Sequence, residues 1–586
     1  MLELIKMTSR IYEKRQKRTI VFLACISVVG ALIDALTVVL LYPLMESLLG
    51  VSAAGENSVL HRLFSLIPYS QQGQTTFLLG LLAVLYLLAG IWKIIQQAVV
   101  SCSLVKIRIR VSARTFRAIL DKPYSYHLQH STAEIHRLVT EDCTRCNTLL
   151  TTMLELVNCF VSAVGVIATL FLLQPGLTLI ICFIALLAVF FLNRWSARVA
   201  QRLSQKNQKH LTLTNRWVYQ AVGALKSVLV NKKEQMFLNQ YAVNAKEAGW
   251  QDAKHDILSG VPKFAMEYGG MAAIFFFVTL YVSVNRDILS IIPTIGTFAM
   301  AAVKLFPYIS VTLKDFTAIN YRKASVDALY DILREDERTE NDTEIVRPLR
   351  KMVVAESLRD GITVDHLSFR FEDANAPLFT DLSIRIPANR SVAFIGTTGS
   401  GKTTLADLIL GLHCPSGGRI LVDGKDISTI RDWWADQIGY IPQFIYLCDD
   451  TIKANVAFGC DPEETDDEKV WSAIKDAQME DFIRTLPEGL NTIVGENGIR
   501  LSGGQRQRIG IARALYQNPS FIVMDEATSA LDQETEAAVM ESIKMLSGRK
   551  TMLIIAHRLS TTKDCDIVYR IENGTATVEK GEDKAQ

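Results

Sequence analysis

The sequence predicts two folds in one chain: an all-α transmembrane domain of six long helices, followed by a soluble α/β domain. Three observations predict this division of the 586 residues. Long apolar stretches fill only the first half, the connections between them are very unequal in length, and the second half holds a glycine-rich loop between a strand and a helix. We place the two domains at residues 1–325 and 361–586, with a charged linker at 326–360 between them.

Six apolar stretches have the length that a helix needs to cross a bilayer, about 17–25 residues. Buried helices of a soluble core explain one such stretch, but not six in half a chain. Five cations at residues 10–18 lie directly ahead of the first stretch, so the positive-inside rule predicts a cytoplasmic N-terminus, and we expect no cleavable signal peptide. Six crossings make this a multi-pass protein of the cytoplasmic (inner) membrane with its second domain in the cytoplasm. The stretches lie near residues 20–44, 77–100, 153–174, 176–193, 263–284 and 288–312.

The connections alternate between short outer turns and long inner segments. Outer turns are predicted at 174–176 and 284–287, whereas the inner segments 101–152 and 194–262 are long, basic and helical in pattern. The membrane helices therefore extend into the cytoplasm, and we expect turns near 121–123 and 231–233 to contact the soluble domain. In the outer segment 45–76, residues 58–67 have helical apolar spacing. They form either a helix on the membrane surface or one packed against the other spans.

Charge and cysteine usage limit the partners of the chain. The formal net charge of +1 gives no indication of a nucleic-acid partner, and we predict none. Ten scattered cysteines, several of them inside apolar stretches, are typical of reduced, buried thiols rather than a disulfide framework. Cys143 and Cys146 form a lone CxxC, which we interpret as two thiols on one helical face rather than a metal site.

A phosphate-binding loop is the strongest signal in the second domain. The strand-like Ser391–Ile395 precedes it and a helical run from Thr404 to Leu412 follows it. Glycines let backbone N–H groups surround phosphates at a helix N-terminus, and the lysine reaches the β/γ-phosphates. The loop consists of Gly396, Thr397, Thr398, Gly399, Ser400, Gly401, Lys402 and Thr403, and we include Thr404 in the nucleotide site.

Two acidic residues end a second buried strand. Phe521–Met524 is apolar throughout, as expected of a parallel strand covered on both faces, and Asp525 and Glu526 follow it. Ligands bind at the carboxyl ends of such strands. Asp525 is predicted to position Mg²⁺ through water, and Glu526 to orient or deprotonate the attacking water.

These motifs, in this order, resemble those of ABC transporters over nearly the whole chain. The family's signature sequence is present as Leu501 to Arg508, and its exporter X-loop as Thr492 to Gly498. Phe371 stands where the family places an aromatic, usually Tyr, that stacks on adenine. The remaining family positions are matched by Gln443 of the Q-loop, Ser529–Asp532 of the D-loop and the switch histidine, His557.

The resemblance implies a type I exporter-like membrane domain, a RecA-like ATPase domain, and hydrolysis of ATP with Mg²⁺. It assigns the chemistry to Glu526, His557, Lys402 and Gln443, with Mg²⁺ held by Thr403 and Gln443. It also implies that the signature motif closes over the phosphate loop of a second ATPase domain. A single chain therefore cannot complete a site, and we predict a homodimer, with a heterodimer as the alternative. In the signature motif, the residues that the resemblance assigns to nucleotide contact are Ser502, Gly503, Gly504 and Gln505.

Ionisable residues inside the apolar stretches point to the substrate, since such residues tend to face a cavity or a partner. Three lysines lie in the inner half of the membrane, counting about 1.5 Å per residue from the outer helix ends. They form either a cationic belt for an anionic headgroup or, with Lys263 snorkelling and pairing with Glu267, ordinary interfacial contacts. The residues concerned are Asp34, Lys93, Lys263, Glu267 and Lys304.

A second resemblance bears on the substrate. Segments at 33–44, 261–263, 304–307 and 442–447 are similar to lipid-linked-oligosaccharide flippases of the PglK type, in which the intramembrane cations are typically Arg. The resemblance implies an amphipathic, anionic lipid-linked oligosaccharide or similar polyprenyl-phosphate glycolipid. A peptide, multidrug or lipid exporter is the alternative, and an ATP-gated channel or sensor is an alternative of a different class.

Overall fold

The computed structural model divides into two compact units, Met1–Lys122 with Tyr126–Ile345, and Pro123–Ser125 with Val346–Gln586. It describes residues 7, 10–49, 71–173, 175–284, 292–334, 358–372, 374–525, 541, 544, 546–556 and 562–581, and within some helices it describes only the backbone. The predicted surface helix at 58–67 lies outside these residues.

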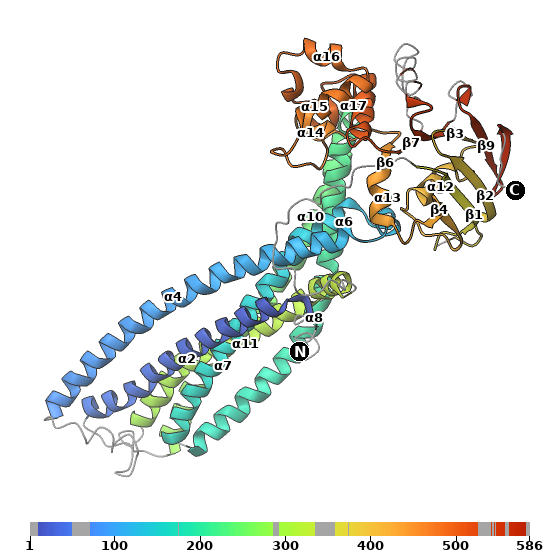
Figure 1. Cartoon of the computed structure of the whole chain (residues 1–586). Helices are drawn as coiled ribbons and strands as arrows, with labels where there is room; N and C mark the ends of the chain where they lie inside the picture. The colour runs from blue at the N-terminus through green and yellow to red at the C-terminus, as the bar shows by residue number, and fades with distance from the viewer. Residues whose placement is uncertain are drawn as a thin grey trace. The chain divides into compact units, whose positions relative to one another are not determined.

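The first unit is built of six long helices, each of which contains most of one predicted span (Figure 1). The longest have 50 and 51 residues, far more than a bilayer crossing needs, so they continue beyond the membrane as expected. By length and hydropathy, three helical segments among the described residues qualify as spans: Lys14–Ile33, Leu79–Leu120 and Thr132–Ala168. The six helices are α2 (Lys14–Leu49), α4 (Gln71–Leu120), α7 (Cys143–Leu173), α8 (Pro175–Gly223), α10 (Glu234–Val284) and α11 (Ile292–Leu333).

Short helices complete the inner connections. Between α4 and α7 lie α5 (Tyr124–Gln129), α6 (Thr132–Arg137) and the π-helix η1 (Leu138–Asp142). Between α8 and α10 lies α9 (Leu225–Val230). Turns at residues 121–123 and 231–233 separate these elements, at the positions predicted for the tips of the inner segments.

An apolar core joins the N-terminal residues to α4, α7 and α11. Tyr12, Ile107, Leu149 and Leu329 are all buried in it. Val326 and Leu333 belong to the same core, so α11 continues to Leu333 and the first part of the segment that we predicted as linker is helical. The helical spacing of these apolar residues explains the continuation.

The CxxC cysteines face this core. Cys143 and Cys146 are both buried; the Tyr12 hydroxyl lies 3.3 Å from Cys146 Sγ, and the Cys143 thiol donates to Thr115 Oγ1 at 3.6 Å. Among the described residues no group of three or more His, Cys, Asp or Glu side chains is placed to hold a metal. The two thiols are packing groups of the helix bundle.

The second unit contains two sheets. A six-stranded sheet has the order β10-β9-β3-β8-β7-β6, in which only β10 pairs antiparallel, and a four-stranded antiparallel sheet has the order β2-β1-β4-β5. The larger sheet consists of β3 (Ser391–Ile395), β6 (Ile438–Ile441), β7 (Phe521–Asp525), β8 (Thr551–Ile555), β9 (Ile567–Glu572) and β10 (Thr575–Lys580). The smaller consists of β1 (Gly361–Phe369), β2 (Phe379–Pro387), β4 (Gly417–Val422) and β5 (Lys425–Asp426).

Helices cover the large sheet on both faces, which is why its central strands are apolar throughout. Along β7, Phe521 and Val523 pack with α12 (Lys402–Ile409), α13 (Arg431–Gln437) and the small sheet. The alternate residues Ile522 and Met524 pack with a helical group on the other face. That group consists of α14 (Ile452–Val456), α15 (Asp467–Asp476), α16 (Glu480–Thr485), the 3₁₀ turns η2 (Gly489–Asn491) and η3 (Glu496–Gly498), and α17 (Gly503–Leu515).

Trp434 fixes the end of the phosphate-loop helix to the sheet. Its ring is 1% exposed and stacks on Phe521 at 5.4 Å, and its Nε1–H donates to the Ile409 carbonyl at 2.9 Å. The side chain therefore joins α13, α12 and β7 in one contact.

We expect Trp434→Ala to lower the stability of the second unit by about 3–5 kcal/mol, because it removes a large buried ring. Trp434→Phe keeps a buried aromatic ring but removes the N–H donor. We expect it to lower the stability less than Trp434→Ala does, with the lost hydrogen bond accounting for about 1 kcal/mol of the decrease. Thermal melting of the full chain in detergent measures both variants. Equal melting temperatures for Trp434→Ala and wild type would contradict this role.

Candidate nucleotide site

The phosphate loop connects a fully buried strand of the second unit, β3, to the N-terminus of α12. All five residues of β3 are buried, and the loop leaves the sheet at Gly396. Gly401 caps α12 with φ of +99°, and a Cβ there would lie 2.7 Å from the Phe379 ring. A Cβ on Gly396 would lie 2.3 Å from the Ile571 carbonyl oxygen. Only glycine fits either position, so the backbone can wrap closely around a ligand.

Lys402 is held inside this loop. Its side chain is 4% exposed, and Nζ donates to the carbonyl oxygens of Gly396 and Thr397 at 3.0 Å each. The Ser400 hydroxyl is also buried, and it has no hydrogen-bond partner within the described part of the chain. A buried cation and an unpartnered hydroxyl beside an exposed helix N-terminus are a set of donors that fits phosphate oxygens.

The strand register brings the other motifs to the same edge of the sheet. Phe394 pairs with Ile555, and Ile555 pairs with Asp525, so Asp525 lies at the level where β3 enters the loop, two strands away. Ile441 pairs with Met524, so Gln443 follows β6 at this edge as well. Asp525 is 8% exposed and Gln443 is half-buried. The strand register therefore brings these two residues to the edge of the sheet at which the phosphate loop lies.

The remaining site residues fall into two groups. Thr397, Thr398, Gly399 and Thr403 are exposed along the loop, and Thr404 is half-buried. Phe371 is 37% exposed and makes edge-to-face contacts with Phe369 and His413, at 4.9 and 5.8 Å between ring centroids. Glu526, His557 and Ser529–Asp532 lie outside the described residues; in the sequence, Glu526 directly follows β7 and His557 follows β8 by two residues.

The signature motif forms the exposed N-terminus of α17. Ser502 is the N-cap: its hydroxyl accepts from Gln505 N–H at 3.2 Å, and its own N–H donates to Gln505 Oε1 at 2.8 Å. Ser502 and Gly503 are exposed, whereas Gly504 is buried. Helix α17 packs on the face of the large sheet that carries Ile522 and Met524, and α12 packs on the opposite face, with Phe521 and Val523. An exposed helix N-terminus of this kind favours an anionic ligand.

Arg513 on the same helix was not predicted from the sequence. Its guanidinium donates to the Tyr446 carbonyl at 2.8 Å and to the Asn455 carbonyl and amide oxygens at 2.8 and 3.0 Å. It also lies 4.6 Å from the Phe458 ring centre. Tyr446 is three residues beyond Gln443, so Arg513 connects the signature helix to the segment that follows the Q-loop.

Asp407 is a second residue that the motifs do not reveal. It lies on α12, five residues after Lys402. Burial, and then the Asp525 carboxylate, raises the pKa of Asp407 to about 6. Burial, Asp525 and Asp407 also raise the pKa of Tyr440 on β6 to about 12. Three titratable side chains from α12, β6 and β7 thus lie close together behind the loop.

The donor set also fits Mg²⁺. Mg²⁺ prefers oxygen ligands, including water and phosphate oxygens. The site offers three such ligands: a threonine hydroxyl at the first turn of α12, a glutamine amide oxygen after β6 and a carboxylate at the end of β7. When bound, Mg²⁺ neutralises phosphate charge. Thr403, Gln443 and Asp525 are the residues that would hold it.

Two family models match this chain in the order of its two units. The ABC transporter transmembrane region matches residues 20–303, and the ABC transporter domain matches residues 379–529, from β2 through the phosphate loop and signature motif. The chain is an ABC exporter with fused transmembrane and ATPase domains. It is therefore a membrane protein whose ATPase is coupled to transport, and its ATPase domain binds ATP.

Curated relatives of the exporter include both lipid flippases and multidrug exporters. ATP-dependent lipid A-core flippases of Cupriavidus pinatubonensis and Cupriavidus metallidurans are each 29% identical, over 80% of this chain and 78% and 77% of theirs. A Staphylococcus aureus protein named as a multidrug export ATP-binding/permease protein is 44% identical, but over only 36% of this chain and 37% of its own.

A solved structure supports the fold. A bacterial Atm1-family ABC exporter with ATP bound aligns over 96% of this chain and 94% of its own, with a TM-score of 0.76 and 23% sequence identity. The predicted fold class, a type I exporter-like helical domain followed by an ABC nucleotide-binding domain, is confirmed. The exporter is a half-transporter, with one membrane domain and one ATPase domain per chain.

The titration of Asp407 gives a test of the residues behind the loop. Its pKa is about 6 in the folded chain, above the ordinary value of 3.8 for an aspartate, so the folded state binds this proton more tightly than the unfolded state. The carboxylate therefore destabilises the fold increasingly as pH rises from 3.8 towards 6, and fully above 6. We expect Asp407→Asn to melt about 2–4 °C above wild type at pH 7.5, with a difference that shrinks towards pH 4.

Asp426→Asn is the matched control with the opposite sign. Hydrogen bonds from the Ser428 hydroxyl and N–H lower the pKa of Asp426, so its carboxylate stabilises the fold at neutral pH and loses this effect as pH falls. Nucleotide-free melting curves of the full chain from pH 4.5 to 8 compare the variants. An Asp407→Asn effect that does not change with pH would contradict the raised pKa of Asp407.

Proposed function

We propose that the exporter is a homodimeric flippase that moves a lipid-linked oligosaccharide, or a similar anionic polyprenyl-phosphate glycolipid, across the cytoplasmic membrane. The proposal of a lipid substrate rests on how much of the chain is similar to the lipid A-core flippases. An alignment of 480 residues cannot be accommodated within residues 361–586, so it extends into the membrane domain, where substrate is bound. The match to the multidrug relative is short enough to fit within those residues.

Charge in the membrane domain supports an anionic headgroup. Lys93 is exposed on α4, and Lys263 and Lys304 belong to α10 and α11, although the side chains of these two, with those of Asp34 and Glu267, lie outside the described part. Three lysines per chain at similar predicted depth become six in a homodimer. Lysine supplies a positive charge but lacks the bidentate hydrogen-bonding geometry of arginine. It can therefore attract a phosphate group without fixing the orientation of that group.

The motifs support the following ATPase steps. Lys402 and the loop N–H groups bind the β/γ-phosphates, and Thr403 and Gln443 would hold Mg²⁺, which would neutralise phosphate charge. Glu526 accepts a proton from the attacking water or orients it, and His557 contacts the γ-phosphate. Ser502 to Gln505 of a second copy complete the site from the other side. Phe371 offers a ring face to adenine.

Export of drugs or peptides is the second candidate, and the 44% identity to a multidrug relative favours it. An ATP-gated channel or sensor is a candidate of a different class. The substrate that stimulates ATP turnover distinguishes all three, since a channel or sensor needs little turnover.

We expect polyprenyl-pyrophosphate glycan to stimulate ATP turnover of the wild-type protein in nanodiscs by about threefold or more. A triple Lys93/Lys263/Lys304→Ala variant should lose this stimulation but keep its basal rate, because it removes the charges that attract the headgroup. The matched triple Lys→Arg variant should retain it. Glu526→Gln is the inactive control, and we expect its ATP turnover to be about 10²-fold or more lower than that of wild type.

Each outcome has a distinct meaning. Stimulation of wild type and the Arg variant, but not the Ala variant, supports both the substrate and the lysines. Equal stimulation of wild type and both variants supports the glycolipid as substrate but contradicts a role for the three lysines in binding it. Stimulation by drugs or peptides but not by the glycolipid rejects the flippase proposal. Turnover in Glu526→Gln contradicts the catalytic assignment.

A further inference from the structure

A buried aspartate lies on α11 just past the inner end of its predicted span. Asp315 is 3% exposed, and its Oδ2 has no hydrogen-bond partner among the residues that the structure describes. Buried carboxylates are normally hydrogen-bonded or paired, because an unpaired charge is costly to move out of water. The surroundings of Asp315 therefore lack a partner that its ionised form needs.

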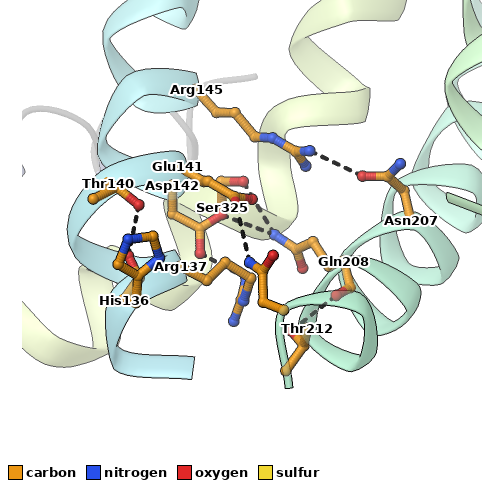
Figure 2. Close-up of polar contacts among 11 residues, drawn as sticks. His136, Arg137, Thr140, Glu141, Asp142, Arg145, Asn207, Gln208, Thr212 and Ser325 are labelled. Carbon is orange, nitrogen blue, oxygen red and sulfur yellow. Dashed lines mark hydrogen bonds and ion pairs between the residues drawn. The ribbon is translucent and has the colours of Figure 1, made fainter. Parts of the chain in front are cut away.

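A second buried aspartate of the same unit shows the contrast (Figure 2). Asp142 of η1 is 1% exposed, and both of its oxygens have partners. Its Oδ2 lies 2.6 Å from Arg137 Nη1, and its Oδ1 accepts a hydrogen bond from Gln208 Nε2 at 3.3 Å. The fold thus supplies partners to both oxygens of Asp142, but not to Oδ2 of Asp315.

The side of α11 that carries Asp315 faces α7. Asp315 and Arg322 are seven residues apart and share one face of the helix, and Arg322 Nη1 donates to the Thr152 hydroxyl of α7 at 3.0 Å. Burial and the like charge of Glu155 disfavour a negative charge on Asp315, whereas two cations favour it. The titratable and charged side chains that act on Asp315 within the described ranges are Glu155 and Cys159 of α7, and Lys314 and Arg322 of α11.

Glu155 gives this position a route to solvent. Its side chain is exposed, and it lies two residues inside the predicted span of α7, about 3 Å from the inner end. Thr152, Glu155, Cys159 and Ser162 recur at intervals of three or four residues, so they share one face of α7. Ser162 is 1% exposed, and its Oγ also has no partner in the part of the chain that the structure describes. A polar stripe therefore runs along α7 from the exposed Glu155 towards the interior of the membrane.

We propose that Asp315 is a proton-binding site of the exporter, reached from the cytoplasmic side through Glu155. A hydronium ion gives its proton to the carboxylate of Asp315 and leaves as water, so the carboxylate becomes a neutral acid and no other bond changes. The neutral acid packs between α7 and α11 without a cationic partner, whereas the ionised form needs water or a cation. The site lies apart from the ATP site, and its role does not depend on the substrate that the exporter carries.

Infrared difference spectroscopy of the full chain in nanodiscs detects this proton directly, because a protonated carboxyl group has its own C=O stretching band. We expect a band from Asp315 in nucleotide-free protein at about pH 7, where an ordinary aspartate is ionised. Asp315→Asn should remove the band, and Asp315→Glu should keep it at a shifted frequency. If Asp315→Asn does not fold, the frequency shift in Asp315→Glu identifies the band by itself.

Asp331→Asn is the matched control on the same helix. Asp331 is exposed and lies 3.6 Å from Arg334 Nη1, so its removal should leave the band unchanged. Glu155→Gln tests the neighbouring acid. Because it removes a negative charge beside Asp315, we expect the pH at which half of the band is lost to fall by at least about 0.5.

The result that would overturn the proposal is the absence, at about pH 7, of any carboxylic acid band that depends on residue 315. Loss of the band when sodium chloride replaces choline chloride at constant pH would assign the site to a sodium ion, and would also overturn it. An unchanged midpoint in Glu155→Gln would contradict the role of Glu155. No transported substrate is added, so failure of the lipid proposal leaves these results unaffected.

Discussion

The turn from β3 into α12 is the constraint on which the rest of the ATPase domain depends. A strand buried along its whole length has to end in a loop that curls tightly enough to expose the first N–H groups of a helix. The carbonyl of Ile571 and the ring of Phe379 leave space for no side chain at Gly396 and Gly401. Packing from both faces of the sheet, including Trp434 against Phe521, holds the strand and helix that define this turn. Asp525 and Gln443 then arrive at the same edge through strand register alone.

In the homodimer that we propose, each chain carries half of each of two ATP sites. The helix after the phosphate loop, α12, packs on one face of the large sheet, and α17, which begins at the signature motif, packs on the other. Arg513 joins α17 to the segment after Gln443, so a ligand that draws the helix start towards it also pulls on the Q-loop segment.

Much of this could be predicted from the sequence, for physical reasons that differ by feature. Six spans follow from the thickness of a bilayer, and the phosphate loop from the need for glycine beside backbone. The helical continuation to Leu333 was missed although Val326, Leu329 and Leu333 have helical spacing, because charged neighbours dominate that segment. Asp407 and the π-turn carry no local sequence signal. The pKa of Asp407 is raised by burial and by Asp525, and the pairing of Asp142 with Arg137 spans the π-turn, so both depend on contacts that the local sequence does not reveal. Contacts that depend on tertiary packing cannot be predicted from a single segment of the chain.

The most direct test of the account places two inactivating changes, Lys402→Ala and Ser502→Arg, in a dimer of differently tagged chains. If each ATP site combines the phosphate loop of one chain with the signature motif of the other, changes in different chains leave one intact site, and changes in the same chain leave none. We therefore predict vanadate trapping of nucleotide in the dimer with one change per chain, and none in the dimer with both changes in one chain. The reverse pattern would show that each chain completes its own site, and would contradict the account.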